Sequence, residues 1–339
     1  MTMLPHAHGA PVMQAKIRSL PEDFFVEEID AFAASGSGEH LLLTIEKREK
    51  NTTEVAQKIA QWAGVALSAV SYAGLKDRNA LTCQRFSVWL PKKIAPDLAA
   101  LEQPGIRLLA SHWHSRKLPR GALAGNRFVL RLREVLGARA AIETRLASIA
   151  AIGVPNYFGE QRFGRGGENV EKARAMFAGR RVKRELRSIL LSAARAEIFN
   201  QILAARVAAG SWNQALPGDV FMLAGSQSIF GPEPPSPALQ ARLADFDIHP
   251  TGALWGRGQL RSEHATAALE LQIAAQHPVL CAGLEQAGLK QERRSLRLLP
   301  ENFTWQWPAA DVLQLSFQLP PGCYATTVLR ELLEAPAAG

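Results

Sequence analysis

Alternation of apolar and polar residues recurs along the chain and predicts strands with one apolar face. The pattern occupies residues 40–47, 85–90, 127–133 and 312–319. Because successive side chains of a strand point to opposite sides, each segment can turn its large apolar residues toward a core. In residues 127–133 the other side carries three arginines. That segment is therefore predicted to have one apolar and one basic face.

A second periodicity, with apolar residues three or four positions apart, predicts helices. It is seen in residues 51–63, 169–177 and 186–207. Asn51 and Glu54 are spaced as a capping pair at the start of the first of these helices. Gly64 and Gly210 follow two of them as stop signals, and a last helix is expected from Thr326.

The order of these elements predicts an α+β fold with a mixed sheet rather than a regular βαβ array. Residues 156–167 are dense in glycine, aromatic residues and arginine, a composition typical of an ordered loop at a domain boundary. Strand-like alternation returns after Phe303. We therefore expect a sheet domain in two parts, residues 1–153 and 300–339, interrupted by an inserted domain at 154–299. Within the insert, residues 232–237 and 252–258 are predicted to be surface loops.

Positive charge is in excess, with 39 lysines and arginines against 31 acidic residues and a formal net charge of +8. Such an excess favours an anionic partner, nucleic acid above all. Much of it falls in three clusters: Arg116, Lys117 and Arg120; Arg127, Arg131 and Arg133; and Arg180, Arg181, Lys183, Arg184 and Arg187. A basic cluster is also often just a solvated face, so charge alone does not decide between RNA binding and solubility.

Several other classes are disfavoured. The three cysteines are far apart, so neither a disulfide framework nor a thiolate metal site is expected. His112 and His114 flank Trp113 near an arginine-rich segment, which is a weak indication of metal binding, and we expect no metal. The chain has no apolar run long enough to cross a bilayer and no signal-like core in its first twenty residues. We expect a monomeric cytoplasmic protein without a membrane partner.

The segment 72–91 contains the strongest candidate for chemistry. Gly74 is expected to permit a tight turn, and Asp77 lies between Lys76 and Arg78 just before a predicted strand. One interpretation is a solvated turn whose exposed charges offset one another and contribute only about 0–1 kcal/mol. The other is a reactive carboxylate held on a rigid anchor, with neighbouring cations that keep it charged and can hold phosphates.

The residues Tyr-Ala-Gly-Leu-Lys-Asp-Arg at 72–78, followed by Thr82 and Gln84, resemble the signature of the TruD family of tRNA pseudouridine synthases. Four further segments agree with that family in order. They are residues 21–24 (Pro-Glu-Asp-Phe), 125–128 (Gly-Asn-Arg-Phe), 154–164 (Val-Pro-Asn-Tyr-Phe-Gly to Gln-Arg-Phe-Gly) and 324–332 (Tyr-Ala-Thr-Thr to Arg-Glu-Leu). Five ordered matches over nearly the whole chain are far more specific than one.

The resemblance implies a split catalytic domain with a largely antiparallel sheet of the pseudouridine-synthase type, interrupted by the family's α/β insert. It implies isomerisation of a tRNA uridine, by the family's usual target position 13, without a cofactor. Asp77 is the matched catalytic carboxylate, and it can attack the ribose, attack the base or abstract a ribose proton. The matched substrate-binding positions are Phe24, Asn126, Phe128 and Tyr324, with Lys76 and Arg18 as cations near the carboxylate.

Two departures from the family pattern affect the predicted site. Arg18 stands where the family has lysine, and Lys16 lies two residues away on the same face of the predicted strand, so either cation can be the partner of Asp77. Tyr324 replaces a phenylalanine.

Two other functions compete with the isomerase hypothesis. A non-catalytic RNA-binding protein would need the basic residues and aromatics but not Asp77, and a carboxylate-dependent hydrolase would need a metal cluster or a second carboxylate.

Overall fold

The structure is a computed structural model that describes residues 4–334. Residues 1–3 and 335–339, which belong to the predicted first and last parts of the sheet domain, lie outside the described residues. The chain forms two compact units. One, here called the sheet unit, holds Met13–Arg139, Pro300–Gly322 and residues 333–334; the other, the helical unit, holds residues 4–12, Ala140–Leu299 and Cys323–Leu332. The predicted division at residues 154 and 299 stays a prediction.

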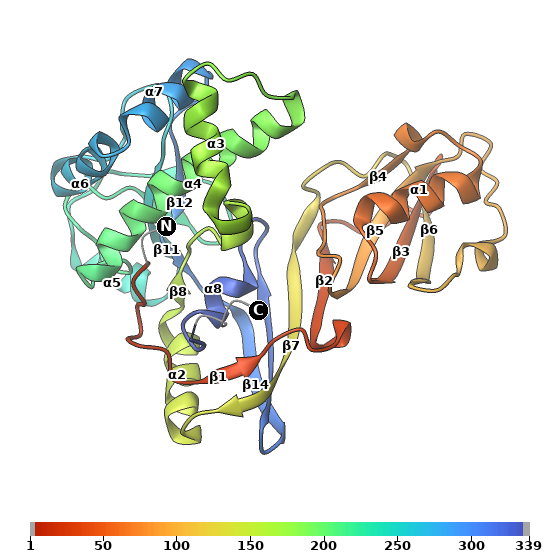
Figure 1. Ribbon diagram of the computed structural model, residues 1–339, viewed down its shortest axis with the longest axis horizontal. Helices are drawn as coiled ribbons and strands as arrows, with labels where there is room; N and C mark the ends of the chain where they lie inside the picture. The colour runs from red at the N-terminus through yellow and green to blue at the C-terminus, as the bar shows by residue number, and fades with distance from the viewer. Residues whose placement is uncertain (1–3, 335–339) are drawn as a thin grey trace. The chain divides into compact units, whose positions relative to one another are not determined.

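Nine strands form one sheet among the described residues of the sheet unit, in the order β14-β15-β7-β2-β5-β3-β6, with β1 beside β7 and β4 beside β5 (Figure 1). Their bounds are β1 Gln14–Lys16, β2 Phe24–Asp30, β3 His40–Arg48, β4 Val70–Tyr72, β5 Leu81–Trp89, β6 Ile106–His114, β7 Leu123–Leu136, β14 Glu301–Ala309 and β15 Val312–Leu319. Only the β2–β5 pair is parallel in this sheet as described. The expected mixed, largely antiparallel α+β sheet is confirmed.

Strand β15 joins the two ends of the chain in one sheet. Its residues alternate between buried and half-buried along their whole length, as the apolar periodicity predicted. It pairs with β7 from Leu313 opposite Leu132 to Leu319 opposite Asn126. The expectation that the last strands return to the N-terminal sheet is therefore confirmed.

Helix α1 (Thr52–Ala63) lies across this sheet and buries Val55 and Ile59 against strand residues (Figure 1). Gly64 ends it in the left-handed region at φ 64°, as predicted. The predicted capping pair forms only in part. The Asn51 side chain makes no capping hydrogen bond, whereas the Glu54 carboxylate interacts with the backbone N–H of Asn51 and also forms an ion pair with Lys50 at 2.9 Å. Short 3₁₀ turns at Pro21–Asp23, Leu67–Ala69 and Leu98–Leu101 complete the unit.

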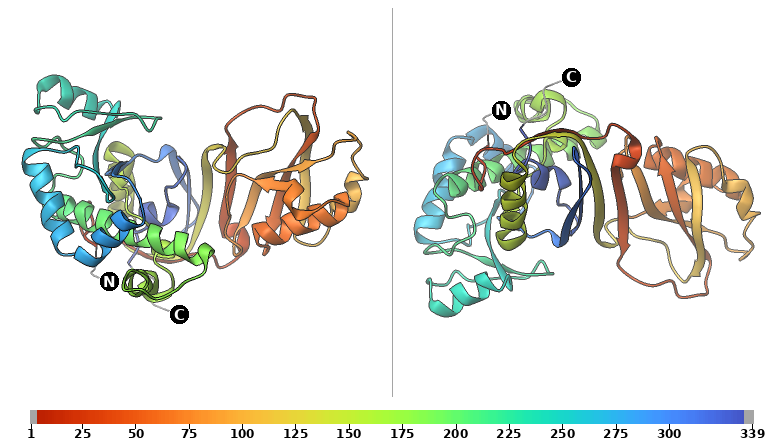
Figure 2. Two further views of the ribbon diagram at one scale, coloured as in Figure 1. Left: turned by 90° about the horizontal axis from the view of Figure 1, so that it is seen from above. Right: turned by 90° about the horizontal axis from the view of Figure 1, so that it is seen from below.

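The helical unit is built around a long central helix, α4. Its helices are α2 Arg139–Ile152, α3 Glu168–Phe177, α4 Arg184–Ala208, α5 Pro237–Ala244, α6 His264–Ala275, α7 Pro278–Gln286 and α8 Ala325–Leu329, with 3₁₀ turns at Glu160–Arg162 and Arg165–Gly167. The stripe Ala194, Ile198 and Ile202 of α4 is buried in a core shared with α3, α6 and α7. Figure 2 shows α4 in green beside the blue helices α6 and α7. The predicted helices and the stop at Gly210 are confirmed.

A four-stranded antiparallel sheet of order β10-β9-β11-β12 packs with α4, where strands are counted over the described residues. The strands are β9 Phe221–Leu223, β10 Ile229–Phe230, β11 Ile248–Leu254 and β12 Glu292–Ser295, and a separate ribbon pairs β8 Val154–Pro155 with β13 Arg297–Leu298. The predicted surface loop at 252–258 was wrong at its start. Gly252 is a buried residue of β11, where a Cβ would lie 2.9 Å from Leu296, so the glycine permits close packing rather than a turn.

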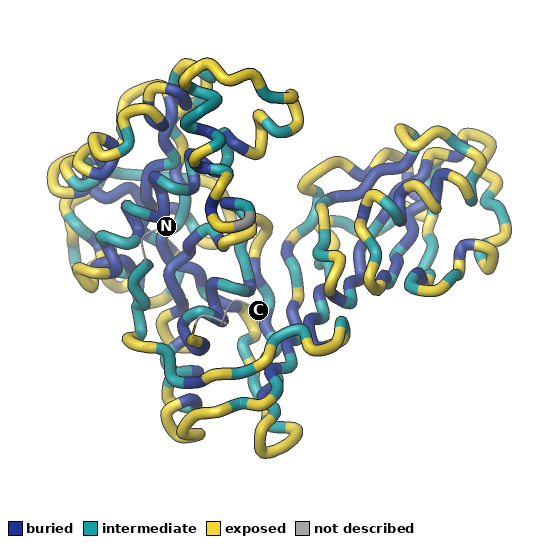
Figure 3. The backbone as a smooth tube through the Cα atoms, in the orientation of Figure 1, coloured by how far each residue is buried: buried dark blue, intermediate teal, exposed yellow. Residues whose placement is uncertain are grey.

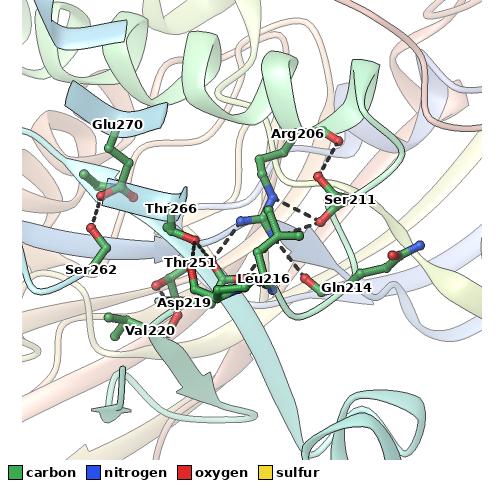
Figure 4. Close-up of polar contacts among 12 residues, drawn as sticks. Arg206, Ser211, Gln214, Leu216, Asp219, Val220, Thr251, Ser262, Thr266 and Glu270 are labelled. Carbon is green, nitrogen blue, oxygen red and sulfur yellow. Dashed lines mark hydrogen bonds and ion pairs between the residues drawn. The ribbon is translucent and has the colours of Figure 1, made fainter. Parts of the chain in front are cut away.

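Two buried ion pairs fix the interior of the helical unit. Figure 4 shows the first of them, between Arg206 and Asp219. Arg206 binds Asp219 at 2.8 and 3.0 Å, and the same guanidinium donates to the carbonyls of Ser211 and Gln214. Arg293 binds Glu270 at 2.6 Å, with both side chains almost fully buried. Burial is concentrated in strands and helix faces, while most connections are exposed (Figure 3). No helix within residues 4–334 has both the length and the apolar character needed to cross a bilayer.

Candidate active site

The loop that carries Asp77 is held in place by three side chains from neighbouring elements. Gln84 of β5 donates to the carbonyl of Gly74 at 3.2 Å, and the backbone N–H of Lys76 donates to the hydroxyl of Thr52 in α1 at 3.0 Å. Lys47 of β3 donates to the carbonyl of Asp77 itself at 2.9 Å. The loop leads directly into β5, as predicted. A carboxylate on such a loop is positioned by the sheet and not by the loop's own stiffness.

Gly74 does not act as predicted. Its φ lies outside the left-handed region, and an added Cβ would meet only the ends of Lys76 and Glu28 at 3.6 and 3.8 Å. The loop is shaped instead by the hydrogen bonds to its backbone. Asp77 adds a local one, since its Oδ1 accepts from the N–H of Asn79 at 3.0 Å.

Arg18 is the ion-pair partner of Asp77. Its Nη2 lies 3.0 Å from Asp77 Oδ2, and both side chains are about one-third exposed. Lys16 pairs instead with Glu134 at 2.6 Å. The two cations do not share a strand face, because β1 ends at Lys16 and Arg18 adopts a left-handed φ of 58°. A non-glycine residue in that region is held there by its surroundings, here by the contacts of its side chain.

The other side of the Arg18 guanidinium meets an aromatic cluster. Its Cζ lies 4.2 Å from the centroid of the Phe24 ring. Phe24 meets Phe128 edge to face at 6.4 Å, and Phe128 stacks on Phe317 at 5.5 Å. The predicted residues Asp77, Arg18, Phe24 and Phe128 are thus joined in a continuous series of contacts. Both residues are buried, with Phe24 5% and Phe128 7% exposed.

Asn126 lies on the same face of β7 as Phe128, two residues away, and is opposite Glu28 of β2. Its side-chain oxygen is buried and has no hydrogen-bond partner within the described part of the chain. An unpaired buried acceptor in a native structure calls for an explanation, and a bound polar ligand is one. Arg18 Nε is in the same state within residues 4–334.

Lys76 is turned away from solvent. Its Nζ lies 2.5 Å from Glu28 Oε1, and the two side chains are 8% and 3% exposed. The second oxygen of Glu28 accepts from the N–H of Arg85 at 3.1 Å. The charge of Lys76 is therefore already matched inside the protein, and its role in binding substrate stays a prediction. Arg78, by contrast, is exposed.

Lys47 was missed by the sequence reasoning as a site residue. Its side chain is fully buried, and its ammonium donates to the carbonyls of Lys50 and Asp77 at 2.8 and 2.9 Å. Burial lowers the pKa of Lys47 to about 8, and the negative charge of Asp77 only partly opposes that. The signal was present, because Lys47 continues the inward-facing series Leu41, Leu43 and Ile45. A lysine at a core position requires buried partners.

Two of the three arginines on the basic face of β7 are paired with carboxylates, and the third donates to a neutral amide. Arg133 binds Asp23 through two hydrogen bonds of 2.8 Å, Arg127 pairs with Glu27 at 3.2 Å, and Arg131 donates to Gln314 at 3.1 Å. Burial alone would raise the pKa of Asp23, but the hydrogen bonds from Arg133 outweigh it, so that the pKa lies below its usual range. The predicted contact of this face with phosphates stays a prediction, and among the described residues Arg131 is the arginine of this face without an ion-pair partner.

Tyr324, the remaining predicted substrate residue, belongs to the helical unit. Its hydroxyl accepts hydrogen bonds from Nε and Nη2 of Arg162 at 3.0 and 2.5 Å, and its ring meets Phe158 edge to face at 6.4 Å. Arg162 and Phe158 come from the segment 154–164 that resembles the family signature. The hydroxyl that distinguishes Tyr324 from phenylalanine therefore has a partner already in place.

Comparisons with known proteins place these motifs in one family. A sequence model of the family described as tRNA pseudouridine synthase D (TruD) matches residues 1–172 and 167–332. The chain belongs to the TruD family. Among relatives, the tRNA pseudouridine synthase D of Xanthomonas axonopodis pv. citri is 57% identical over 100% of this chain and 96% of its own length. That of Nitrosococcus oceani is 49% identical over 99% and 95%.

The fold of this TruD family member is also found in a solved structure. A crystal structure from Methanosarcina mazei, described as tRNA pseudouridine synthase D, matches with a TM-score of 0.74 over 98% of this chain and 96% of that one. Its sequence identity of 21% makes this a likeness of fold. The recognition of the family and the α+β class, both made from sequence motifs, are confirmed.

Proposed function

We propose that this chain isomerises a uridine of tRNA, at position 13, to pseudouridine, with Asp77 as the catalytic residue. The observation that carries the proposal is the Asp77–Arg18 ion pair on a loop anchored by Thr52, Gln84 and Lys47. The Asp77 carboxylate is about one-third exposed, so it is open to a ligand while its backbone is fixed. Membership of the TruD family supports the reaction.

The reaction breaks the N1–C1′ bond of uridine, turns the base and forms a C5–C1′ bond, after which C5 loses its proton and N1 gains one. The proposed role of Asp77 is to assist at the ribose or base, by attack on C1′, attack on the base, or removal of a ribose proton. Arg18 orients the carboxylate by its charge-assisted hydrogen bond. The step is an isomerisation and needs no oxidant, reductant or cofactor.

The target base must leave its stack, which costs a few kcal/mol and requires a receiving pocket. Phe24 and Phe128 supply aromatic faces, and the unpaired oxygen of Asn126 supplies an acceptor for an N–H of the base. In this proposal Lys76 orders the loop through Glu28, and Tyr324 contacts the RNA from the helical unit.

A tRNA substrate also implies that the protein works in the cytoplasm, and we propose that it does so as a monomer.

Asp77→Asn tests the proposal because it removes charge and basicity but nearly keeps size. Release of the C5 hydrogen from tRNA labelled at uridine should fall by more than about a hundredfold in single turnover, equivalent to at least about 2.7 kcal/mol in the barrier. Affinity for tRNA should stay within a few fold. Asp245→Asn, an equal change of charge at an exposed position, is the control and should keep the parent rate.

Two results would contradict the proposal. If Asp77→Asn retains more than about a hundredth of the parent rate, Asp77 is not the catalytic residue. If the parent binds tRNA but releases no C5 hydrogen from any tRNA, the protein is an RNA-binding protein without this activity.

A further inference from the structure

Of the three basic clusters in the sequence, the third is the one in which no member has a partner among the described residues. In the first, Lys117 donates to the carbonyl of Ser68 and Arg120 lies 3.8 Å above the ring of Tyr72. The second, on β7, is paired as described above. The third comprises Arg180, Arg181, Lys183, Arg184 and Arg187, here called the α3–α4 basic loop. Within residues 4–334, none of its five side chains forms a hydrogen bond, ion pair or ring contact with another residue.

The five side chains are also exposed. The loop joins the end of α3 to the start of α4 (Figure 1), and the backbone there is coloured mainly as exposed (Figure 3). Only Val182 and Leu186 within it are half-buried, packed on the core of the helical unit. These two apolar residues hold the loop to the fold, so the five cations are presented from a fixed base.

The fold itself gives no reason for this arrangement. Lys183 is the N-cap of α4, and Arg184 and Arg187 lie in its first turn. The helix macrodipole puts partial positive charge at that end, where acidic residues are stabilising and cations are not. Glu185 is the only acidic residue of the first turn as described. The charges therefore oppose local stability, and an anionic partner outside the chain would relieve that repulsion.

We propose that the α3–α4 basic loop binds the phosphate backbone of the RNA substrate. This rests on the proposed function, which supplies the RNA. The RNA backbone presents regularly spaced phosphates, which five unpaired cations over eight residues can contact together. A single small anion is a poorer match, because no buried polar group among the described residues of the loop forms a pocket for it. The loop reads charge and not base sequence, since lysine and arginine contacts to phosphate position a protein without specifying bases. It lies in the helical unit, away in sequence from Asp77.

The test compares two variants that each reduce the formal net charge by two, from the +8 of the parent. Arg180→Gln with Arg181→Gln removes cations from the loop, and Lys92→Gln with Lys93→Gln removes exposed cations from the sheet unit. The dissociation constant for unmodified tRNA is measured from about 50 to 200 mM salt. The loop variant should reduce the slope of log affinity against log salt by about 1 to 2 and weaken binding about tenfold or more at 0.1 M salt. The control should keep the parent slope.

Two further measurements distinguish loss of RNA binding from loss of catalysis and from loss of stability. The single-turnover rate at saturating tRNA should equal that of the parent, because the loop binds and does not react. The thermal midpoint should equal or exceed that of the parent, since no contact is lost and repulsion at the start of α4 is reduced. Equal salt slopes for the loop variant and the parent would overturn the proposal, and if the parent still forms pseudouridine, the proposed function stands.

Discussion

Two cations contact the Asp77 segment, and they differ in what they do there. Arg18 reaches the carboxylate from a partly exposed position, whereas Lys47 is fully buried and reaches the backbone carbonyl. The charged groups that act on Lys47 are Asp77 and Glu54, which raise its pKa, and Lys76, which lowers it together with burial. Lys47 is thus a positioning residue whose charge depends on pH in the alkaline range.

That charge makes a prediction about stability. The pKa of Lys47 is about 8 in the folded chain, below the 10.5 of a free lysine, so between these values the unfolded chain binds more protons. The contribution of Lys47 to the free energy of unfolding should therefore rise as pH rises from about 8 to 10.5, by an amount on the order of 3 kcal/mol at most. In urea denaturation, the free energy of unfolding of the parent minus that of Lys47→Met should increase with pH over this range.

Lys58→Met serves as the matched control because Lys58 is exposed on α1. The free energy of unfolding of Lys58→Met should differ from that of the parent by the same amount at every pH from 7 to 10. A flat difference for Lys47→Met as well would mean that the buried amine does not titrate in this range. The Lys47 variant should also lower the rate of pseudouridine formation with little change in tRNA affinity, because it frees the carbonyl of Asp77 and leaves the α3–α4 basic loop, the proposed phosphate contact, unchanged.

At the scale of single residues, the sequence predicted which residues belong to the candidate site better than it predicted which side chains pair with one another. Asp77, Phe24 and Phe128 follow from motifs, but the choice between Arg18 and Lys16 depended on where β1 ends. The Lys76–Glu28 pair was beyond reach, since it depends on the register that sets β2 against β5, the strand that follows the Lys76 loop. Short-range patterns do not contain that register.

Secondary structure elements were predictable where burial is one-sided. Strands β3, β7 and β15 and helices α1 and α4 carry clear periodicities and were found. Strand β6 was missed because it is the edge of the sheet and its residues are mostly half-buried or exposed, so that little alternation is imposed on them. Gly252 was misjudged because a glycine needed for close approach looks the same in sequence as one needed for a turn.

The buried ion pair between β12 and α6 gives a prediction at this scale. Arg293 is held by Glu270 and by Thr251, and Glu270 also accepts from Ser262 and from the N–H of Ala253. Glu270→Gln leaves the guanidinium buried without its counter-charge, and breaking such a pair costs about 3–5 kcal/mol. Urea denaturation should show a loss in that range.

The matched control is Glu168→Gln, which breaks an exposed pair with Lys172 whose side chains are 43% and 52% exposed. Exposed pairs contribute about 0–1 kcal/mol, so this variant should unfold close to the parent. Equal losses for the two substitutions would mean that the Arg293–Glu270 pair contributes no more than a surface contact.

At the scale of the whole molecule, the sequence predicted that one sheet is assembled from both ends of the chain. That followed from the same alternation at residues 127–133 and 312–319, and the two segments do pair. Where a folding unit begins and ends is harder to predict, because contacts and not periodicity decide it. The two compact units exchange short segments near residues 12, 139 and 323. Turn-forming residues lie near each of these positions, at Pro11, Gly137 and 320–322, but similar residues also mark turns that do not separate units.

The insert hypothesis can be tested at the ribbon formed by β8 and β13. Val154 lies opposite Leu298 and Pro155 opposite Arg297 in antiparallel pairing. Paired residues of antiparallel strands are only about 5 Å apart at their Cα atoms, so a two-residue Asn-Gly turn can replace the chain between them. We expect the shortened protein to unfold in one cooperative transition, because the strands that build the nine-stranded sheet in the described chain all lie outside the deleted part. It should also bind tRNA more weakly, because it lacks the α3–α4 basic loop.

Leu315→Ala provides the internal check. Leu315 is fully buried in β15, opposite Leu130 of β7, and a leucine-to-alanine change in a core costs about 2–5 kcal/mol. If the sheet is intact without the insert, this substitution should lower the urea midpoint of the shortened protein as it does that of the full chain. A shortened protein with no cooperative transition, or one indifferent to Leu315→Ala, would show that residues 154–299 are needed to form the sheet and are not an autonomous insert. The division of the chain would then follow the two compact units, in which residues 140–153 and 323–332 belong with the helices and not with the sheet.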